Sequence, residues 1–576
     1  MSETLRGRLR LLLVIFSVLT GLIITRLISL QFGSSVSFFE DQYKLASSYP
    51  IKITPPRGRI FDRNGELLAT NDVQYALGLS PDFVTDPEGM AKVLAAVLNR
   101  PVEELVAITQ PAPAGADVAK YVPIQKPVSA EIGEKLLAMQ RDPAGPDLNG
   151  LIVEPFQTRT YPGGTLAANV LGFVGYDGKG YYGVEEFYNE ILSGHPVVGI
   201  KQVVPFDVAL NPAPDQGADL YLTIDRGIQF LAQETLANAL QYYGGESGSI
   251  TIMDPKTGRI LAMAVSPSYD PNKFLTEPEA NRANPAVSAQ FEPGSTFKII
   301  TMASALQSGT VRPETTYFDT GHIEVGGVGI TNWNGGAWGT QDMTGVLQHS
   351  LNVGTAWVST HMGPQKFYDY LTAFGIGQAT NIDLSGEAAG TLSRPGDPNW
   401  YESNLGTNAF GQGVAVTPIQ LLAAASAVAN GGAMMQPHVL ERVSDGGVVH
   451  TTRPQVLGRP ISADAANTLS SMLAVSLERE ASNALLPGYR LAGKTGTAQI
   501  PIAGGYDYSK TIATFIGWGP VDDPKFIVLI KLDKPTASPW GSETAAPTFG
   551  EMVKRLVVLM KIPPDNVRQA LAASGQ

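Results

Sequence analysis

The chain has no cysteine among its 576 residues, and only 16% of its side chains are charged. The absence of cysteine excludes disulfides, thiolate metal ligands and cysteine nucleophiles. Basic residues are outnumbered by acidic ones, and the resulting net charge of −12 argues against nucleic acid as a partner. The six histidines show no metal-ligand spacing. The sequence therefore predicts neither a metal site nor a nucleic-acid-binding surface.

Apolar residues, at 44% of the chain, are numerous enough to bury a core, which excludes a disordered protein. Three arginines lie within residues 1–10, and an uncharged run follows at 11–25. Counted through residue 32, with Arg26 near the outer end, the segment makes a helix of about 33 Å, enough for a hydrocarbon core of about 30 Å. No small-residue cleavage site follows, which favours an uncleaved anchor over a signal peptide. The arginines predict a cytoplasmic N-terminus and an extracytoplasmic remainder.

Two large regions follow the expected anchor. Residues 34–217 mix short strand-like and helical stretches, with a Pro/Ala/Gly-rich loop at 110–116 and a linker-like stretch at 211–217. Residues 218–576 place strands at both ends and helices between them, which predicts an α/β domain whose sheet is closed by its first and last strands. Its expected strands are 220–224, 249–253, 260–265, 511–518 and 526–532, and its expected helices include 228–240 and 545–560.

The first of three chemical patterns is Ser295-Thr-Phe-Lys298, which follows a Pro-Gly turn. Apolar residues at helical spacing continue almost to Gly309, so Ser295 is expected at or near a helix N-terminus with Lys298 one turn on, on the same face. A serine hydroxyl becomes a nucleophile when a neighbouring base removes its proton, and lysine serves if burial and the helix end lower its pKa. On its own, the pattern favours a solvated lysine in a first helical turn.

The second pattern is Ser350-Leu-Asn352, where a hydroxyl can relay a proton and an amide can orient a lysine and a substrate carbonyl. The third, Lys494-Thr-Gly-Thr497, lies on a strand of small residues that lets a ligand approach the backbone closely. Its lysine and hydroxyls suit a carboxylate, and an exposed strand edge suits an extended peptide. The same tripeptide at 256–258 lies in an expected hairpin turn and is interpreted as structural.

The three patterns occur in this order, 55 and then 144 residues apart. The set is typical of penicillin-binding proteins and class A β-lactamases. On these residues the sequence resembles the transpeptidase family of penicillin-binding proteins. The flanking stretches that support the resemblance are 217–225, 291–298, 411–418 and 515–518.

The first region resembles the pedestal of the monofunctional class B enzymes. The stretches that carry this likeness are 56–65, 67–69, 159–163, 171–175 and 183–185. The resemblance implies a cytoplasmic tail at 1–10, a transmembrane anchor at 11–32, a dimerisation-type pedestal at 34–217 and a catalytic domain at 218–576. The implied fold is an α/β transpeptidase domain of the penicillin-binding and serine β-lactamase type, an antiparallel sheet flanked by helices, on an elongated α+β pedestal.

The family resemblance implies a mechanism. Ser295 would attack the penultimate D-alanine carbonyl of a peptidoglycan stem peptide, with Lys298 as general base. Ser350 and Lys494 would pass the proton to the departing D-alanine, and Asn352 would hold Lys298 and the substrate amide. Thr495 and Thr497, with Gly496 between them, would bind the terminal carboxylate, and the backbone N–H groups of residues 295 and 497 would form the oxyanion hole. An amine of a neighbouring stem peptide would then resolve the acyl-enzyme, with no cofactor.

Several alternatives remain open. A D,D-carboxypeptidase or β-lactamase-like hydrolase shares the acylation apparatus, and a non-catalytic β-lactam-binding scaffold shares the fold. Within class B, residues 292–298 and 411–420 favour a division or sporulation enzyme over an elongation enzyme. No glutamate-rich glycosyltransferase signature occurs in the sequence, so the resemblance implies that a polytopic glycosyltransferase of the shape, elongation, division and sporulation class polymerises the glycan. That partner would contact the anchor and the pedestal, and β-lactams would be ligands of the active site.

Overall fold

The structure is a computed structural model that describes residues 3–32, 48–110, 121–202, 215–502 and 504–574. It contains two compact units, one formed by residues 1–56 and 194–217 and the other by residues 57–193 and 218–576. The expected loop at 110–116 and the linker at 211–217 lie largely outside the described residues. The two compact units are defined by contacts within the chain and not by function. The expected domain boundaries therefore stay a prediction.

The first unit contains helix α1 (Glu3–Phe32) and a two-stranded sheet. Within α1, the segment Leu5–Ser29 is long and apolar enough to cross a membrane. Strand β1 (Ser48–Ile53) pairs antiparallel with β8 (Val197–Gln202), although the two are far apart in sequence. The apolar run expected at 11–32 therefore lies on a single helix.

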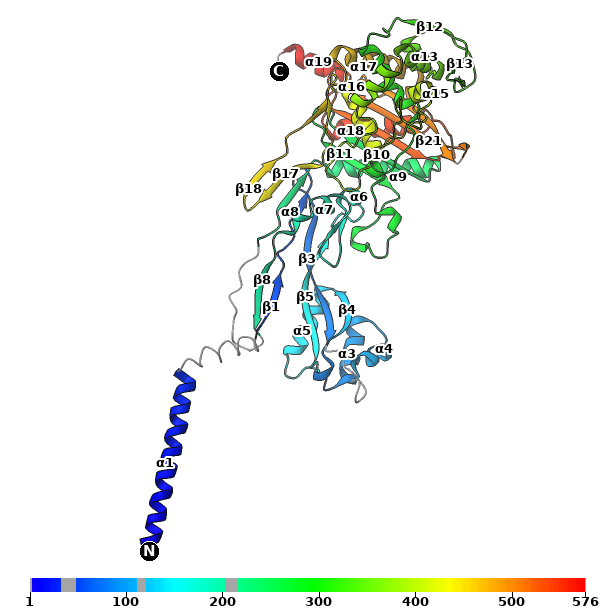
Figure 1. The fold of residues 1–576 in the computed structure, drawn as a ribbon. Helices are drawn as coiled ribbons and strands as arrows, with labels where there is room; N and C mark the ends of the chain where they lie inside the picture. The colour runs from blue at the N-terminus through cyan, green and yellow to red at the C-terminus, as the bar shows by residue number, and fades with distance from the viewer. Residues whose placement is uncertain (1–2, 33–47, 111–120, 203–214, 503, 575–576) are drawn as a thin grey trace. The chain divides into compact units, whose positions relative to one another are not determined.

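In the second unit, β3 (Leu67–Leu79) is the central strand of the N-terminal part. It pairs antiparallel with β2 (Ile60–Phe61), β4 (Val122–Val128) and β5 (Leu151–Thr160). The last residues of β3 are mostly buried and share a hydrophobic cluster with helices α3 (Pro87–Leu98), α4 (Val102–Thr109) and α5 (Ala130–Arg141). These local helices give the β3 sheet a core of its own (Figure 1).

The same sheet continues into the C-terminal part of the sequence. Strand β9 (Asp219–Leu222) pairs parallel with β2 and antiparallel with β17 (Leu440–Asp445), and β17 pairs with the edge strand β18 (Val448–Thr451). Between β5 and β9 lie the short elements α6 (Ala168–Leu171), β6 (Phe173–Val174), β7 (Gly180–Tyr181), α7 (Gly183–Phe187) and α8 (Asn189–Ser193). The strand expected at 220–224 is thus present, but its partners come from distant segments.

A second, five-stranded sheet lies at the centre of the C-terminal part. Its order is β11 (Ile260–Ser266), β10 (Ser247–Met253), β22 (Phe526–Asp533), β21 (Gly505–Gly519) and β20 (Ala492–Ile502). Every neighbouring pair is antiparallel. The antiparallel sheet built from the first and last strands is therefore confirmed, and β20 with its Lys-Thr-Gly pattern forms one edge.

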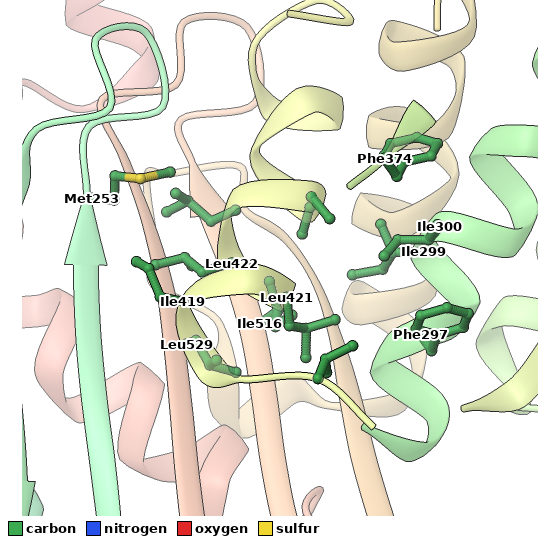
Figure 2. Packing of buried hydrophobic residues seen from close by; sticks show 14 of the residues in the cluster. Met253, Phe297, Ile299, Ile300, Phe374, Ile419, Leu421, Leu422, Ile516 and Leu529 are labelled. Atoms are coloured by element: carbon green, nitrogen blue, oxygen red, sulfur yellow. The ribbon is translucent and has the colours of Figure 1, made fainter. Parts of the chain in front are cut away.

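Helices cover both faces of this sheet because its strands alternate their side chains. On β22, Val528 and Ile530 belong to the cluster with α9 (Arg226–Tyr243) and α18 (Ala545–Leu559), whereas Leu529 faces the opposite cluster. On that opposite side, Figure 2 shows side chains of α16 (Pro418–Ala429) between the sheet and α11 (Lys298–Gln307). The turn that contains Ser295 therefore leads into a helix that is packed in the core.

The remaining helices and strands of the C-terminal part surround this core. They are α10 (Pro285–Ser288), β12 (Thr316–Asp319), β13 (His322–Val325), β14 (Val328–Thr331), β15 (Gly339–Asp342), α12 (Met343–Gln348), α13 (Asn352–Met362), α14 (Pro364–Ala373), α15 (Ser403–Thr407), β16 (Met434–Met435), β19 (Val456–Gly458), α17 (Ala463–Glu480) and α19 (Asp565–Ser574). Of these, α12, α13 and α17 contribute side chains to the site described next.

Candidate active site

Ser295 lies in a 3₁₀ turn, Gly294–Phe297, that leads directly into α11. The sequence predicted Ser295 at or near the N-terminus of a helix, and the α-helix begins at Lys298, directly after this turn. The turn depends on Gly294, whose φ of +55° is costly for a residue with a side chain. Ser295 therefore stands just before the helix, and Lys298 is the first residue of it.

The Ser295 turn packs tightly against two other segments. A Cβ atom on Gly294 would lie 2.8 Å from the Thr497 carbonyl oxygen of β20, and one on Gly411 would lie 2.3 Å from the Gly294 carbonyl oxygen. Gly411 also has a positive φ, +81°. Gly294 and Gly411 are therefore required where the backbone of the Ser295 turn lies close to the backbone of these two segments.

Lys298 is completely buried below Ser295. Its Nζ donates to the Ser350 carbonyl oxygen at 2.6 Å, to Ser350 Oγ at 3.2 Å and to Asn352 Oδ1 at 2.8 Å. Burial first, and the charge of Lys494 second, hold the pKa of Lys298 well below its usual range. Because of this shift, Lys298 can be uncharged and accept a proton at a pH where a free lysine cannot.

Ser350 links the two lysines. Its Oγ lies 3.1 Å from Lys494 Nζ and 3.2 Å from Lys298 Nζ. It occupies the short connection between α12 and α13 with a φ of +53°, an uncommon conformation for serine. Asn352 is the first residue of α13, and its Nδ2 donates to the Thr331 carbonyl oxygen at 3.2 Å, which fixes the orientation of the amide.

The Lys-Thr-Gly residues lie on the edge strand β20. Lys494 is 5% exposed, and burial lowers its pKa to about 8, although the charge of Glu480 acts in the opposite direction. Thr495 and Thr497 are half-buried and lie on one face of the strand. The Thr497 hydroxyl accepts a hydrogen bond from the Gly541 N–H at 3.0 Å. Gly496 lies so close to Thr514 and Thr296 that a side chain would collide with them.

Six of the eight predicted site residues line one cavity of about 280 Å³: Ser295, Ser350, Asn352, Thr495, Gly496 and Thr497. The other two, Lys298 and Lys494, are buried and reach the cavity through Ser350 Oγ. Within the described ranges, no hydrogen bond joins the Ser295 hydroxyl to Lys298. Catalytic hydrogen bonds in enzymes without substrate are often longer than in the complex. A larger hollow of about 880 Å³ lies between α9 and α18 and contains none of these residues.

The sequence did not predict several other residues that line the cavity. Trp333 and Trp540 meet edge to face with their ring centroids 5.4 Å apart. His349 and Glu480 also line the cavity, and His349 Nδ1 lies 2.8 Å from Glu480 Oε1. His349 is adjacent to Ser350, which was a signal available in the sequence. The other three come from distant loops or a helix end and carry no local pattern.

Two known protein families match large parts of the chain. The penicillin-binding protein transpeptidase domain matches residues 248–554, more than half of the sequence, and the penicillin-binding protein dimerisation domain matches residues 52–205. The chain belongs to the class B penicillin-binding proteins. The expected family, fold class and enzyme class, a serine transpeptidase, are thereby confirmed.

Relatives across this family align with nearly the whole chain. Stage V sporulation protein D of Bacillus subtilis is 34% identical over 98% of this chain and 87% of its own length. The peptidoglycan D,D-transpeptidase FtsI of Escherichia coli K12 is 30% identical over 89% of this chain and 85% of its own. The crystal structure of penicillin-binding protein 3 from Mycobacterium tuberculosis with aztreonam superposes with a TM-score of 0.69 at 27% identity, covering 89% of this chain and 98% of that one.

Proposed function

We propose that this class B penicillin-binding protein is a peptidoglycan D,D-transpeptidase that cross-links stem peptides through an acyl-enzyme on Ser295. The observation that carries the proposal is the buried Lys298 amine nitrogen, held by Ser350 and Asn352 next to the cavity that Ser295 lines. A lysine whose pKa is held low by burial is a competent general base. β-Lactams, which carry a reactive amide, are the inhibitors expected for the same serine.

In the acylation step, Lys298 Nζ takes the Ser295 hydroxyl proton while Oγ attacks the carbonyl carbon of the penultimate D-alanine. The backbone N–H groups of Ser295 and Thr497 hold the oxyanion, where each such donor contributes about 3 kcal/mol. The peptide C–N bond then breaks, and the proton passes to the departing nitrogen. Ser350 Oγ suits this relay because it lies within hydrogen-bond distance of both lysines.

The edge strand β20 binds the donor substrate. Thr495 and Thr497 bind the terminal carboxylate of the donor peptide, with the Lys494 charge behind them. Gly496, which has no side chain, lets β20 lie close against Thr296 and Thr514. Asn352 Oδ1 accepts from Lys298, and its amide holds the donor carbonyl in register. An amine of a second stem peptide then attacks the Ser295 ester, which forms the cross-link and releases the Ser295 hydroxyl.

A two-substrate reaction tests this function. A stem pentapeptide ending in D-Ala-D-Ala is supplied as donor, with its own amine acetylated, together with a tetrapeptide acceptor that carries a free amine. Mass spectrometry of the products should show one D-alanine released for each cross-linked dimer. Release of the free tetrapeptide acid alone would identify a carboxypeptidase, and the absence of both products with an unreacted serine would identify a scaffold.

We further propose that the chain is a single-pass membrane protein with its N-terminus in the cytoplasm. The apolar segment of α1 and the arginines that precede it support this topology. Because the chain has no cysteine, Gly7→Cys and Ser574→Cys each introduce a single thiol. A membrane-impermeant maleimide should label intact cells that carry Ser574→Cys and leave Gly7→Cys unlabelled, whereas the reverse pattern would invert the topology.

The proposed physiological role is septal wall synthesis, in division or sporulation, with a polytopic glycosyltransferase that contacts the anchor and the pedestal. Two relatives that align over most of their own length support a role of this kind. They are stage V sporulation protein D and the peptidoglycan D,D-transpeptidase FtsI. A fluorescent fusion should concentrate at the septum, and a uniform side-wall signal would indicate elongation instead. Copurification tests this partnership. A polytopic glycosyltransferase should copurify with the full chain, and it should be lost when residues 3–32 are exchanged for an unrelated anchor.

A further inference from the structure

Glu480 brings a carboxylate to the wall of the cavity that contains Ser295. It is the last residue of α17, and its side chain is 45% exposed. Glu543 is the other acidic residue that lines this cavity, and its Oε2 accepts a hydrogen bond from the Ser538 hydroxyl at 2.6 Å. Of the two carboxylates, Glu480 lies on the side of the cavity formed by Gln348, His349 and Ser350.

The contacts of Glu480 involve one of its two carboxylate oxygens. His349 Nδ1 lies 2.8 Å from Oε1, and Gln348 Nε2 donates to the same oxygen at 3.4 Å. The His349 ring is itself stacked on Trp338, with centroids 4.1 Å apart. Among the residues that the structure describes, no hydrogen bond or ion pair reaches Oε2. The carboxylate is therefore half exposed and able to accept from a ligand.

Glu480 also lies close enough to affect the charge of the catalytic centre. Burial lowers the pKa of Lys494, and the Glu480 carboxylate is the charged group that acts against this shift. The charge of Lys494 repels any cation that approaches the Ser295 ester. An anionic side chain near Lys494 offsets this repulsion, because opposite charges interact strongly where water is partly excluded. The geometry suits a cationic ligand next to the acyl-enzyme.

We propose that Glu480 is the binding residue for the acceptor substrate, whose ammonium group docks on its carboxylate beside the Ser295 ester. The inference rests on the proposed function, because an amine acceptor is the second substrate of transpeptidation. Glu480 binds the charged form, and after loss of one proton to solvent the free amine attacks the ester carbonyl. The donor peptide, held along β20, does not require Glu480. Glu480 therefore acts on the binding of the acceptor, and the effect of its charge on Lys494 is measured separately through the rate of acylation of Ser295.

The test compares two acceptors with the full-length chain in detergent micelles. One is a tetrapeptide with a primary amine, which is charged at neutral pH. The other is the same peptide with an aminooxy group, whose nitrogen is uncharged there. Glu480→Gln should raise the KM for the primary amine about tenfold or more and leave the KM for the aminooxy peptide unchanged, since a charge-assisted hydrogen bond is lost. Glu480→Asp, which keeps the charge, should restore part of the affinity.

Glu478→Gln is the matched control. Glu478 lies on the same helix, is 48% exposed, pairs with Arg490 and does not line the cavity. The inference is overturned if Glu480→Gln behaves like this control, if both acceptors weaken equally, or if the rate of Ser295 acylation by penicillin falls enough to explain the loss. If the wild-type chain forms the acyl-enzyme but joins neither acceptor, or forms no acyl-enzyme at all, transpeptidation itself fails and the acceptor assignment fails with it.

Discussion

At the scale of single residues, the proposed chemistry depends on keeping Lys298 uncharged. Burial opposes the charged form of Lys298, and the second cation, Lys494, opposes it further. Asn352 supplies an acceptor at 2.8 Å without adding a negative charge. The amide therefore holds the lysine in place while leaving its pKa low, which a carboxylate at the same position would not do.

The replacement Asn352→Asp tests this balance. A carboxylate 2.8 Å from Nζ favours the charged lysine and raises the pKa of Lys298. The base is active only when neutral, so the acylation rate increases as pH rises through the pKa of Lys298 in the folded protein. In Asn352→Asp this increase should move to higher pH, and acylation at pH 7 should slow at least about tenfold, since one pKa unit is a factor of ten.

Stopped-flow acylation by a fluorescent penicillin from pH 5 to 10 measures both effects. Asn238→Asp, which places the same change on an exposed position of α9, should leave the profile unchanged. A profile for Asn352→Asp that keeps its wild-type midpoint would show that Lys298 is not the titrating base.

Some site residues belong to local sequence patterns and could be predicted, whereas others reach the cavity only through the fold. Ser295, Lys298 and Asn352 belong to short patterns whose order along the chain carries the information, so they were predictable. Trp540 and Glu480 reach the cavity from segments more than 180 residues beyond Ser295, and nothing in their neighbourhood marks them. Their placement follows from packing of the sheet against α17 and the loop before α18, which a single sequence does not encode locally.

At the scale of elements, the edge strand β20 is held in position by glycines. A Cβ atom on Gly541 would lie 2.2 Å from the Gly496 carbonyl oxygen and 2.7 Å from that of Thr514. The Gly541 N–H also donates to Thr497 Oγ1. The loop before α18 therefore packs directly against the strand proposed to bind substrate, and the spacing leaves no room for a methyl group.

Gly541→Ala should displace β20 relative to the Ser295 turn. The carbonyl oxygens of Gly496 and Thr514 cannot move independently of their strands, and a misplacement of about 1 Å costs about a hundredfold in rate. The second-order rate constant for acylation by penicillin should fall by about that factor. Gly458→Ala, where the nearest atom lies 3.8 Å from the added Cβ, is the control. A Gly541→Ala protein with wild-type acylation would mean that the loop does not position β20.

The elements themselves were largely predictable where their partners are close in sequence or their periodicity is strong. The helix expected at 228–240 is α9, and the strands expected at 249–253, 260–265 and 526–532 are β10, β11 and β22. Ser295 lies near the start of its helix, as predicted, and the chain winds as a 3₁₀ helix from Gly294 before the α-helix begins at Lys298. The pairing of β9 with β2 and β17 was not predictable, since it joins strands about 160 and 220 residues apart.

At the scale of the whole molecule, a buried charge cluster ties together segments of the pedestal region. Glu185 has no exposed surface, and its two oxygens pair with Arg57 at 2.6 Å and Arg159 at 2.7 Å. The Tyr161 hydroxyl donates to the same carboxylate at 3.3 Å, and burial raises the pKa of that tyrosine well above its usual range. Three segments far apart in sequence therefore depend on one carboxylate.

Glu185→Gln should destabilise this region strongly. The glutamine keeps the shape of the side chain, but it leaves two buried guanidinium groups without their counter-charge, which costs about 3–5 kcal/mol. The midpoint of urea denaturation, followed by tryptophan fluorescence, should fall. Glu190→Gln removes a charge from an exposed position of the neighbouring helix α8 and should have little effect. Equal midpoints for the two variants would mean that the cluster does not hold the segments together.

The central claim, that Ser295 is the nucleophile of a transpeptidase centre, is tested most directly by intact-protein mass spectrometry after incubation with a penicillin. The wild-type chain should gain the mass of one penicillin, and peptide mapping should place it on Ser295. Ser295→Ala should gain none while keeping the thermal midpoint of the wild type. A covalent adduct on Ser295→Ala, or a wild-type chain that is never acylated, would contradict the account.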